Sequence, residues 1–421
     1  MAHLKPMCDT HTRQHSHWLW MASLSLAALM SLGLKLWIAY TTVGTNDVTT
    51  WERFATTAQQ VGGAELYRRQ ALFNHPPFMV HVLHLQVFLT HRTGLPFPFW
   101  LRLPAILADL GIVILVWKTL TPPPEQGGRL AALLLLAAAP PLIMISGFHG
   151  NTDPAMICFV VLAVYLLDRR AAVIPAGVAL GMALSIKIVP VIFIPVMVFY
   201  LSTWRARLTF CVAAAAMWCA GALPYLVQVP QLIIRQVFAY AGNYGQWGIS
   251  RIFVLRAARA HPGVTWSELE HGPYADIGRI MILVSIVAAA AWMNRSSLRK
   301  PSLFVQCGLV AFLFLALSPA FGVQYLAWLM PWVIALGFRT TLVLYTVSGI
   351  FLFQVYTFWA GTFPWNYAKS PHFGWQGRII AFDLLCWTCV VVVLGHFFAM
   401  VWKAQRGDTY IREHTLDNRT R

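Results

Sequence analysis

Several carboxylate and imidazole side chains stand where apolar stretches meet, not in ordinary hydrophilic segments. Asp47, in TNDVTTWERF, could serve as a general base toward a hydroxyl group, although an N-cap role for a surface helix explains an Asp at this place as well. Asp153, in GFHGNTDPAM, precedes Pro154 as at an ordinary helix start. That explanation does not cover His149, which lies between two apolar runs. Asp47, His149 and Asp153 are therefore the candidate catalytic residues.

A second group of side chains could bind an anionic substrate. Lys187 separates two short apolar runs in LSIKIVPV; it could reach lipid headgroups or contact a phosphate. Arg235 begins an arginine-containing stretch that would attract lipid headgroups or a phosphorylated substrate. In SPAFGVQYLAWLMPW, Tyr325 suits an interfacial aromatic belt, whereas Gln324 has no such explanation.

The composition indicates an integral membrane protein. Hydrophobic residues make up 58% of the sequence and charged residues 11%, against about a quarter charged in a soluble domain. The net charge of +16 comes from Lys and Arg scattered singly between apolar runs. This pattern indicates membrane topology and lipid phosphate, with no nucleic-acid partner. The cysteines lie almost entirely in apolar stretches and predict no disulfide framework.

The apolar runs recur along the whole chain, many near the roughly 20 residues that cross a bilayer as a helix. We therefore predict an all-α polytopic membrane protein with about twelve transmembrane helices. The predicted spans are 18–40, 103–118, 129–147, 154–168, 171–186, 188–202, 208–226, 276–293, 302–318, 325–338, 341–360 and 378–402.

One further apolar segment, 76–91, is predicted to lie on the membrane surface. Its histidines, His81, His84 and His91, fall on one helical face, as in an amphipathic interfacial helix. With this segment outside, short outer loops hold only Lys187, Lys369 and Arg378, and both termini are cytoplasmic. Ten basic residues then fall on the inner side: Lys118, Arg129, Arg169, Arg170, Arg205, Arg207, Arg295, Arg299, Lys300 and Arg339.

This topology leaves two long outer loops, 41–102 and 227–275, with amphipathic surface helices expected in the first. Loops longer than a connection needs are usually functional. We predict a catalytic module over 1–340, followed by further transmembrane helices and a short cytoplasmic tail over 341–421. The candidate residues of both groups then share the outer side.

The order of these motifs resembles the GT-C superfamily of integral membrane glycosyltransferases over roughly 18–340. Asp47 matches the catalytic Asp of the family's first outer loop in its placement. NHPPFM resembles the start of the second surface helix in that loop and adds His75 as a binding candidate. LRLPAILADLGIVIL and GFHGNTDP are similar to segments of dolichyl-phosphate-glucose glucosyltransferases. GFHGNTDP also resembles the outer Asp-Pro of aminoarabinose and protein mannosyl transferases, and SPAFGVQYLAWLMP a segment of GPI-mannosyltransferases.

The resemblance implies transfer of a hexose, mannose or glucose-like, from a polyprenyl-phosphate donor to a lipid or glycan acceptor, with inversion. Asp47 would be the base, His149 and Asp153 would shape the pocket, and Lys187, Arg235 and Gln324 would hold the leaving phosphate. Asn46 replaces one member of the acidic pair that some members carry, which argues against a paired-carboxylate metal site. A divalent cation, Mg²⁺ or Mn²⁺, stays open.

Two alternative functions remain. A lipid-linked-sugar flippase would also have many spans, but transporters tend to show repeats and a midplane site, whereas the polar residues here gather at the outer surface. An enzyme similar to O-antigen ligases would use a diphosphate-linked glycan. Residue usage favours a bacterial inner membrane. The sugar, the acceptor and the oligomeric state are left open by the sequence.

Overall fold

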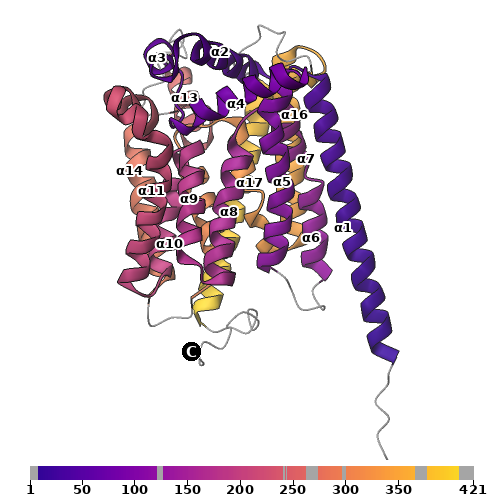
Figure 1. Cartoon of the computed structure of the whole chain (residues 1–421). Helices are drawn as coiled ribbons and strands as arrows, with labels where there is room; N and C mark the ends of the chain where they lie inside the picture. The colour runs from indigo at the N-terminus through magenta and orange to yellow at the C-terminus, as the bar shows by residue number, and fades with distance from the viewer. Residues whose placement is uncertain are drawn as a thin grey trace, which may run out of the picture.

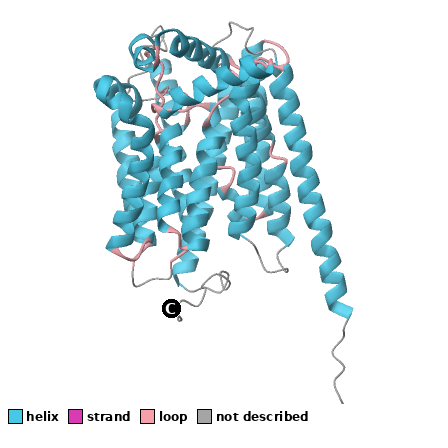
Figure 2. Cartoon of the chain, in the orientation of Figure 1, coloured by secondary structure: helices cyan, strands magenta, loops and turns pink. Residues whose placement is uncertain are grey.

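The computed structural model describes residues 8–120, 127–239, 242, 244–261, 274–295, 300–365 and 377–406. Within these ranges the chain is helical, with turns and short loops between the helices (Figure 2). One isolated antiparallel bridge joins Tyr244 to Ala320, and no strand occurs in the described part. The predicted all-α class is confirmed.

The first half of the chain begins with one long helix at the edge of the bundle, and the helices that follow it lie across the upper end of the bundle (Figure 1). The elements are α1 (Cys8–Thr41), α2 (Asn46–Val61), α3 (Gly63–Arg69), α4 (Phe78–Thr93), α5 (Phe97–Leu120), α6 (Gly127–Ala137), α7 (Pro140–Leu142), the π-helix η1 (Ile143–His149), α8 (Asp153–Arg170) and α9 (Val173–Ile186).

The second half adds helices on the other side of the bundle and returns toward α1 through α16. Its elements are the 3₁₀ helix η2 (Val189–Phe193), α10 (Ile194–Tyr200), α11 (Trp204–Gln228), α12 (Pro230–Ile233), the π-helix η3 (Ile234–Phe238), α13 (Gly248–Ala260), α14 (Tyr274–Met293), α15 (Leu303–Leu317), the 3₁₀ helices η4 (Val323–Trp328) and η5 (Trp332–Leu336), α16 (Phe338–Ala360) and α17 (Arg378–Arg406).

The protein is an integral membrane protein. Seven helical stretches among the described residues are long and apolar enough to cross a bilayer, and 173–186, 189–200 and 303–317 are shorter apolar helices. The outer surfaces of the long helices expose large apolar side chains, for example Ile280 at 65% and Leu283 at 64%. Lipid is the environment in which such surfaces are stable.

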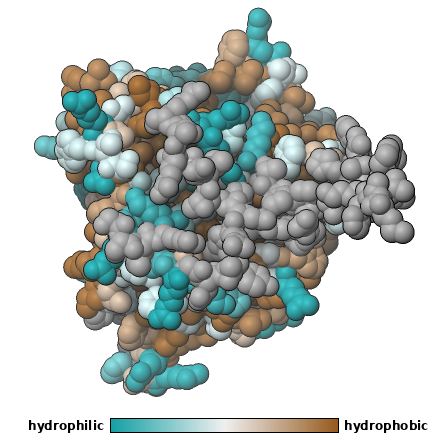
Figure 3. Space-filling model, turned by 90° about the horizontal axis from the view of Figure 1, so that it is seen from below, coloured by the Kyte–Doolittle hydropathy of each residue, from teal (hydrophilic) through white to brown (hydrophobic). Residues whose placement is uncertain are grey.

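The N-terminal end of α1 and the C-terminal end of α17 lie at the same end of the bundle, opposite α2 and α3 (Figure 1). Viewed from that lower end, hydrophilic side chains lie among apolar ones (Figure 3). Helix ends that carry basic residues face this way, including those at Lys118, Arg169, Arg205 and Lys403. Of the basic residues used for the topology prediction, Arg299 and Lys369 lie outside the described residues, and nothing is described of the side chain of Arg129.

The predicted span at 325–338 is wrong. This stretch forms the two 3₁₀ helices η4 and η5, and nearly all of its side chains are buried inside the protein. Pro331 falls between the two elements and cannot donate a backbone hydrogen bond. Irregular backbone at membrane depth is tolerated where protein surrounds it, and here it brings η4 against α8 and η1.

The segment predicted to lie on the membrane surface forms α4, which packs against α2, α5 and α9. Together, α2, α3 and α4 lie across the upper end of the bundle (Figure 1). The first long loop therefore covers the ends of the membrane helices with helical structure. Asp47 and His75 lie in this cover.

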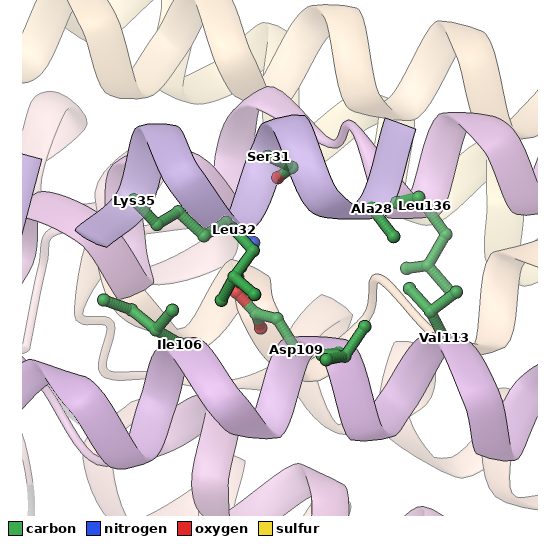
Figure 4. Close-up of a pocket in the computed structure, with 10 residues that line it drawn as sticks. Ala28, Ser31, Leu32, Lys35, Ile106, Asp109, Val113 and Leu136 are labelled. Carbon is green, nitrogen blue, oxygen red and sulfur yellow. Dashed lines mark hydrogen bonds and ion pairs between the residues drawn. The ribbon is translucent and has the colours of Figure 1, made fainter. Parts of the chain in front are cut away.

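Helix α1 lies at the edge of the bundle and contacts chiefly α5, α6 and η1. Lys35 of α1 donates to Asp109 of α5 at 2.6 Å, and both side chains are almost fully buried. The pair lines a small cavity between the helices, with Ser31 and Leu32 on the α1 side (Figure 4).

We expect Lys35→Met alone, or Asp109→Leu alone, to destabilise the folded protein by roughly 3–5 kcal/mol, because each leaves one buried charge without its partner. The double variant Lys35→Met/Asp109→Leu should recover much of the loss. The measurement is thermal unfolding in detergent micelles. A double variant no more stable than the worse single variant would contradict a paired, buried interaction.

Candidate active site

Asp47 projects from the start of α2, the helix that crosses the upper end of the bundle. The N-cap of α2 is Thr45, whose hydroxyl accepts a hydrogen bond from the backbone N–H of Asp47. Thus Asp47 is not the cap, and its carboxylate is available for other contacts. Asp47 Oδ2 accepts hydrogen bonds from His149 Nε2 and Asn151 Nδ2, each at 3.0 Å. The Asp47 side chain remains 36% exposed, so a substrate can reach it.

His149 ends the π-helix η1, a wider turn that is frequent at functional sites. Its Nε2 faces the Asp47 carboxylate and its Nδ1 lies 2.9 Å from the hydroxyl of Tyr356, on α16. Because a carboxylate only accepts, we assign the proton to Nε2. The hydroxyl of Tyr356 fixes the other edge of the ring. Orientation of an imidazole by a second partner is a recurring feature of catalytic sites.

Two glycines allow the turn before α2 to lie directly on the turn after η1. Gly44 and Gly150 have φ angles of +99° and +81°, which favour glycine. A Cβ at Gly150 would lie 2.2 Å from Val48 Cγ2, and one at Gly44 would lie 2.8 Å from the carbonyl oxygen of Phe148. Larger residues would therefore push Asp47 and His149 apart.

The surroundings of Asp47 keep its carboxyl group ionised. Loss of water around the side chain acts to raise its pKa, but the charge of His149 and the hydrogen bonds from His149 and Asn151 oppose this, as does the charge of Lys187. The net result is a pKa below the usual value. An ionised carboxylate with an exposed face can accept a proton.

Asp153 lies in a different environment from Asp47. It opens α8 and its side chain is fully buried. Lys187 Nζ donates to both of its carboxylate oxygens at 3.0 Å, and Trp328 Nε1 donates to Oδ1 at 2.5 Å. The charge is therefore compensated by an ion pair and an indole donor, as a buried carboxylate requires. Asp153 holds Lys187 in place rather than facing a substrate.

Lys187 follows the last residue of α9 and lies among aromatic rings. Its ammonium is 5.1 Å from the ring centroid of Tyr325 and 5.7 Å from that of Trp328, within the range of cation–π attraction. The two rings are stacked, with centroids 4.1 Å apart. Lys187 does not reach outward to lipid headgroups. It contributes a fixed positive charge beside Asp47.

His75 precedes α4 and joins the same cluster. Its ring lies against Trp51 of α2 with centroids 4.4 Å apart, and Nδ1 is 3.5 Å from the carbonyl oxygen of Ile186. Burial and the nearby charge of Lys187 lower the pKa of His75 to about 3. The ring is neutral at physiological pH, so it can offer a hydrogen-bond acceptor to a hydroxyl group.

Other predicted residues are placed outside these contacts. Gln324 is half-buried beside Tyr325 and has no hydrogen bond to a described residue. Arg235 is exposed on η3, and the described contacts do not join it to the cluster. Asn151, within GFHGNTDPAM, and Tyr356 are residues of the cluster that the sequence does not predict. A tyrosine inside a long apolar helix gives no signal of its role in the sequence.

The described residues contain no group of three or more His, Cys, Asp or Glu side chains arranged to hold a metal ion. The arrangement nevertheless offers a carboxylate with an exposed face, the neutral imidazole of His75 and the partly exposed ammonium of Lys187 within one cluster. These groups can together accept a proton, bind a hydroxyl and stabilise an anion.

The chain matches a known family over most of its central part. The profile described as Glycosyltransferase family 87 matches residues 73–319, more than half of the chain. The matched range includes His75, His149, Asp153 and Lys187, whereas Asp47 precedes it. No curated protein matches the chain.

We expect Trp328→Phe to lower the free energy of unfolding by about 1–3 kcal/mol more than Trp332→Phe, because Trp328 donates a hydrogen bond to a buried carboxylate. Trp332 is an apt control since it is equally buried and its Nε1 has no described partner. Both substitutions remove the same ring volume. Thermal unfolding in detergent gives the comparison, and equal losses would refute the contribution of the Trp328–Asp153 hydrogen bond.

Proposed function

The chain belongs to glycosyltransferase family 87, and from that premise we propose that it transfers a hexose from a polyprenyl-phosphate donor to a lipid or glycan acceptor, with inversion, on the extracytoplasmic face. The observation that carries this proposal is the Asp47 carboxylate: it is hydrogen-bonded by His149 and Asn151, yet 36% exposed. Asp153, the other carboxylate of the cluster, is fully enclosed.

The proposed reaction is a single displacement. An acceptor hydroxyl gives its proton to Asp47 while its oxygen forms a bond to the anomeric carbon of the donor sugar. The bond from that carbon to the phosphate oxygen breaks, and its electron pair leaves with the polyprenyl phosphate. One base is sufficient, in contrast with the carboxylate pair of most glycoside hydrolases. His149 and Asn151 orient the Asp47 carboxylate, and His75 accepts a hydrogen bond from a substrate hydroxyl.

Lys187 is the proposed partner of the leaving phosphate. Its ammonium has three donors, and Asp153 takes two of them. The aromatic rings and Asp153 hold the ammonium in one place, so it needs little reorganisation when negative charge develops on the phosphate. We retain Arg235 and Gln324 as further contacts for a long lipid-linked donor. Arg235 lies on η3, which follows α11 and α12, and Gln324 lies on η4, which follows α15.

The proposed side of the membrane rests on the distribution of basic residues. They gather at the helix ends opposite α2 and α3, where the N-terminal end of α1 and the C-terminal end of α17 also lie. Basic residues near membrane helices mark the cytoplasmic side. Both termini would then be cytoplasmic and the site would face outward, in a bacterial inner membrane.

The test of the base is Asp47→Asn in membranes supplied with radiolabelled mannosyl- or glucosyl-phosphopolyprenol. We expect transfer of label into the membrane's own acceptors to fall by at least about 10²-fold, because general base catalysis contributes roughly that much or more. Asp153 is fully buried and is therefore a poor control. The control variant is Asp276→Asn, at the start of α14.

Near-normal turnover by Asp47→Asn would show that Asp47 is not the base. Movement of the labelled donor across proteoliposome membranes, without a covalent product, would indicate a flippase. Labelled product formed only from a diphosphate-linked glycan would indicate an enzyme similar to O-antigen ligases.

His149→Ala gives a prediction for pH dependence. Removing the imidazole takes away its charge and its hydrogen bond, both of which lower the pKa of Asp47, so this pKa rises. The acidic limb of the kcat/KM profile, where Asp47 becomes protonated, should therefore move to higher pH. His91→Ala, on the exposed face of α4, should leave the profile unchanged. An acidic limb that stays in place in His149→Ala would contradict the pairing of these two groups.

A further inference from the structure

The guanidinium of Arg102 lies fully buried near the start of α5. No ion pair in the described part of the chain supplies it with a carboxylate. It donates instead to backbone oxygens from two separate segments. Nη2 reaches the carbonyl oxygens of Ala39, at 2.9 Å, and of Thr42. Nη1 reaches those of Gly147, at 3.1 Å, and Phe148, at 3.3 Å.

These oxygens belong to the ends of two helices. Ala39 and Thr42 lie at the C-terminal end of α1, and Gly147 and Phe148 in the last turn of η1. Carbonyls at a helix C-terminus lack intrahelical partners and carry partial negative charge. A guanidinium has five donors in a rigid plane, so one Arg102 side chain can satisfy both ends at once. A lysine ammonium could not span the two segments in the same way.

Thr45 makes a second connection between the same segments. Its hydroxyl donates to the carbonyl oxygen of His149 at 2.8 Å and accepts from the backbone N–H of Asp47 at 3.3 Å. The hydroxyl group therefore lies between the backbones of the two residues whose side chains meet at 3.0 Å. Thr45 is fully buried, so water does not compete for these bonds.

We propose that Arg102 and Thr45 form a backbone clamp that sets the position of Asp47 against His149, and that both are positioning residues for the transfer reaction. Arg102 joins the two helix ends, and Thr45 joins the backbone of Asp47 to that of His149. A displacement of about 1 Å at a catalytic group can lower a rate by roughly 10²-fold. The clamp touches no substrate, so its loss should act on kcat more than on KM. This inference rests on the role of Asp47 proposed above.

The sharpest variants are Thr45→Val and Thr45→Ser. Valine keeps the shape of threonine but has no hydroxyl, whereas serine keeps the hydroxyl. We expect Thr45→Val to lower kcat for label transfer from mannosyl- or glucosyl-phosphopolyprenol by roughly ten- to a hundredfold, with the donor KM changed by less than about threefold. Thr45→Ser should restore most of kcat. The rescue would not be expected if Thr45 only filled space.

Arg102→Lys tests the other half of the clamp against a matched control. Arg169 donates to the carbonyl oxygen of Thr119 at the C-terminal end of α5, an arginine-to-helix-end contact at the opposite end of the bundle. Both Lys variants weaken such a contact and should lower the melting temperature. Only Arg102→Lys should lower kcat, by at least about tenfold.

The outcomes separate this inference from the proposed function. If Asp47→Asn keeps near-normal turnover, the base assignment fails. If Asp47→Asn loses turnover while Thr45→Val keeps the kcat of the unsubstituted protein, the clamp is overturned and the base stands. Equal loss of kcat in Arg102→Lys and Arg169→Lys, or no rescue by Thr45→Ser, would also overturn the clamp, since either result indicates general destabilisation.

Discussion

The buried guanidinium of Arg102 is the contact on which the arrangement of the site depends. Two helix ends, each with unpaired carbonyls, meet inside a membrane protein where water cannot satisfy them. Arg102 supplies donors to both. Asp47 lies at the start of the next helix, α2, and His149 is the last residue of η1. This gives α1 a role beyond anchoring the chain. The Lys35–Asp109 ion pair attaches the same helix to α5 farther down.

The two carboxylates of the cluster show how environment separates roles. Asp153 is enclosed and paired with Lys187 and Trp328, whereas Asp47 keeps an exposed face and accepts hydrogen bonds from His149 and Asn151. A buried charge must be compensated, so Asp153 serves to fix Lys187. The neighbouring aromatic rings of Tyr325 and Trp328 complete that support. One carboxylate thus builds the site and the other is available for chemistry.

The site is assembled from distant parts of the chain. The family match covers His75, Arg102, His149 and Lys187, but Asp47 precedes the matched range and Tyr325, Trp328 and Tyr356 follow it. The unusual backbone elements lie at the junctions: η1 delivers His149, and η4 delivers the aromatic rings. A regular helix through 325–338 would have carried Tyr325 and Trp328 on a continuous span. The short 3₁₀ turns instead keep both rings against Lys187.

The sequence alone determined the membrane class, the helical architecture and the helix at α4, because apolar length and helical periodicity are local properties. It also indicated Asp47, His149, Asp153 and Lys187, since polar residues beside apolar runs require a reason. Only the tertiary structure decided their partners. The pairing of Lys187 with Asp153, the contact of Tyr356 with His149 and the place of Arg102 between two helix ends each join residues far apart in the chain. Such contacts depend on how helices pack, and no local pattern of residues records that packing.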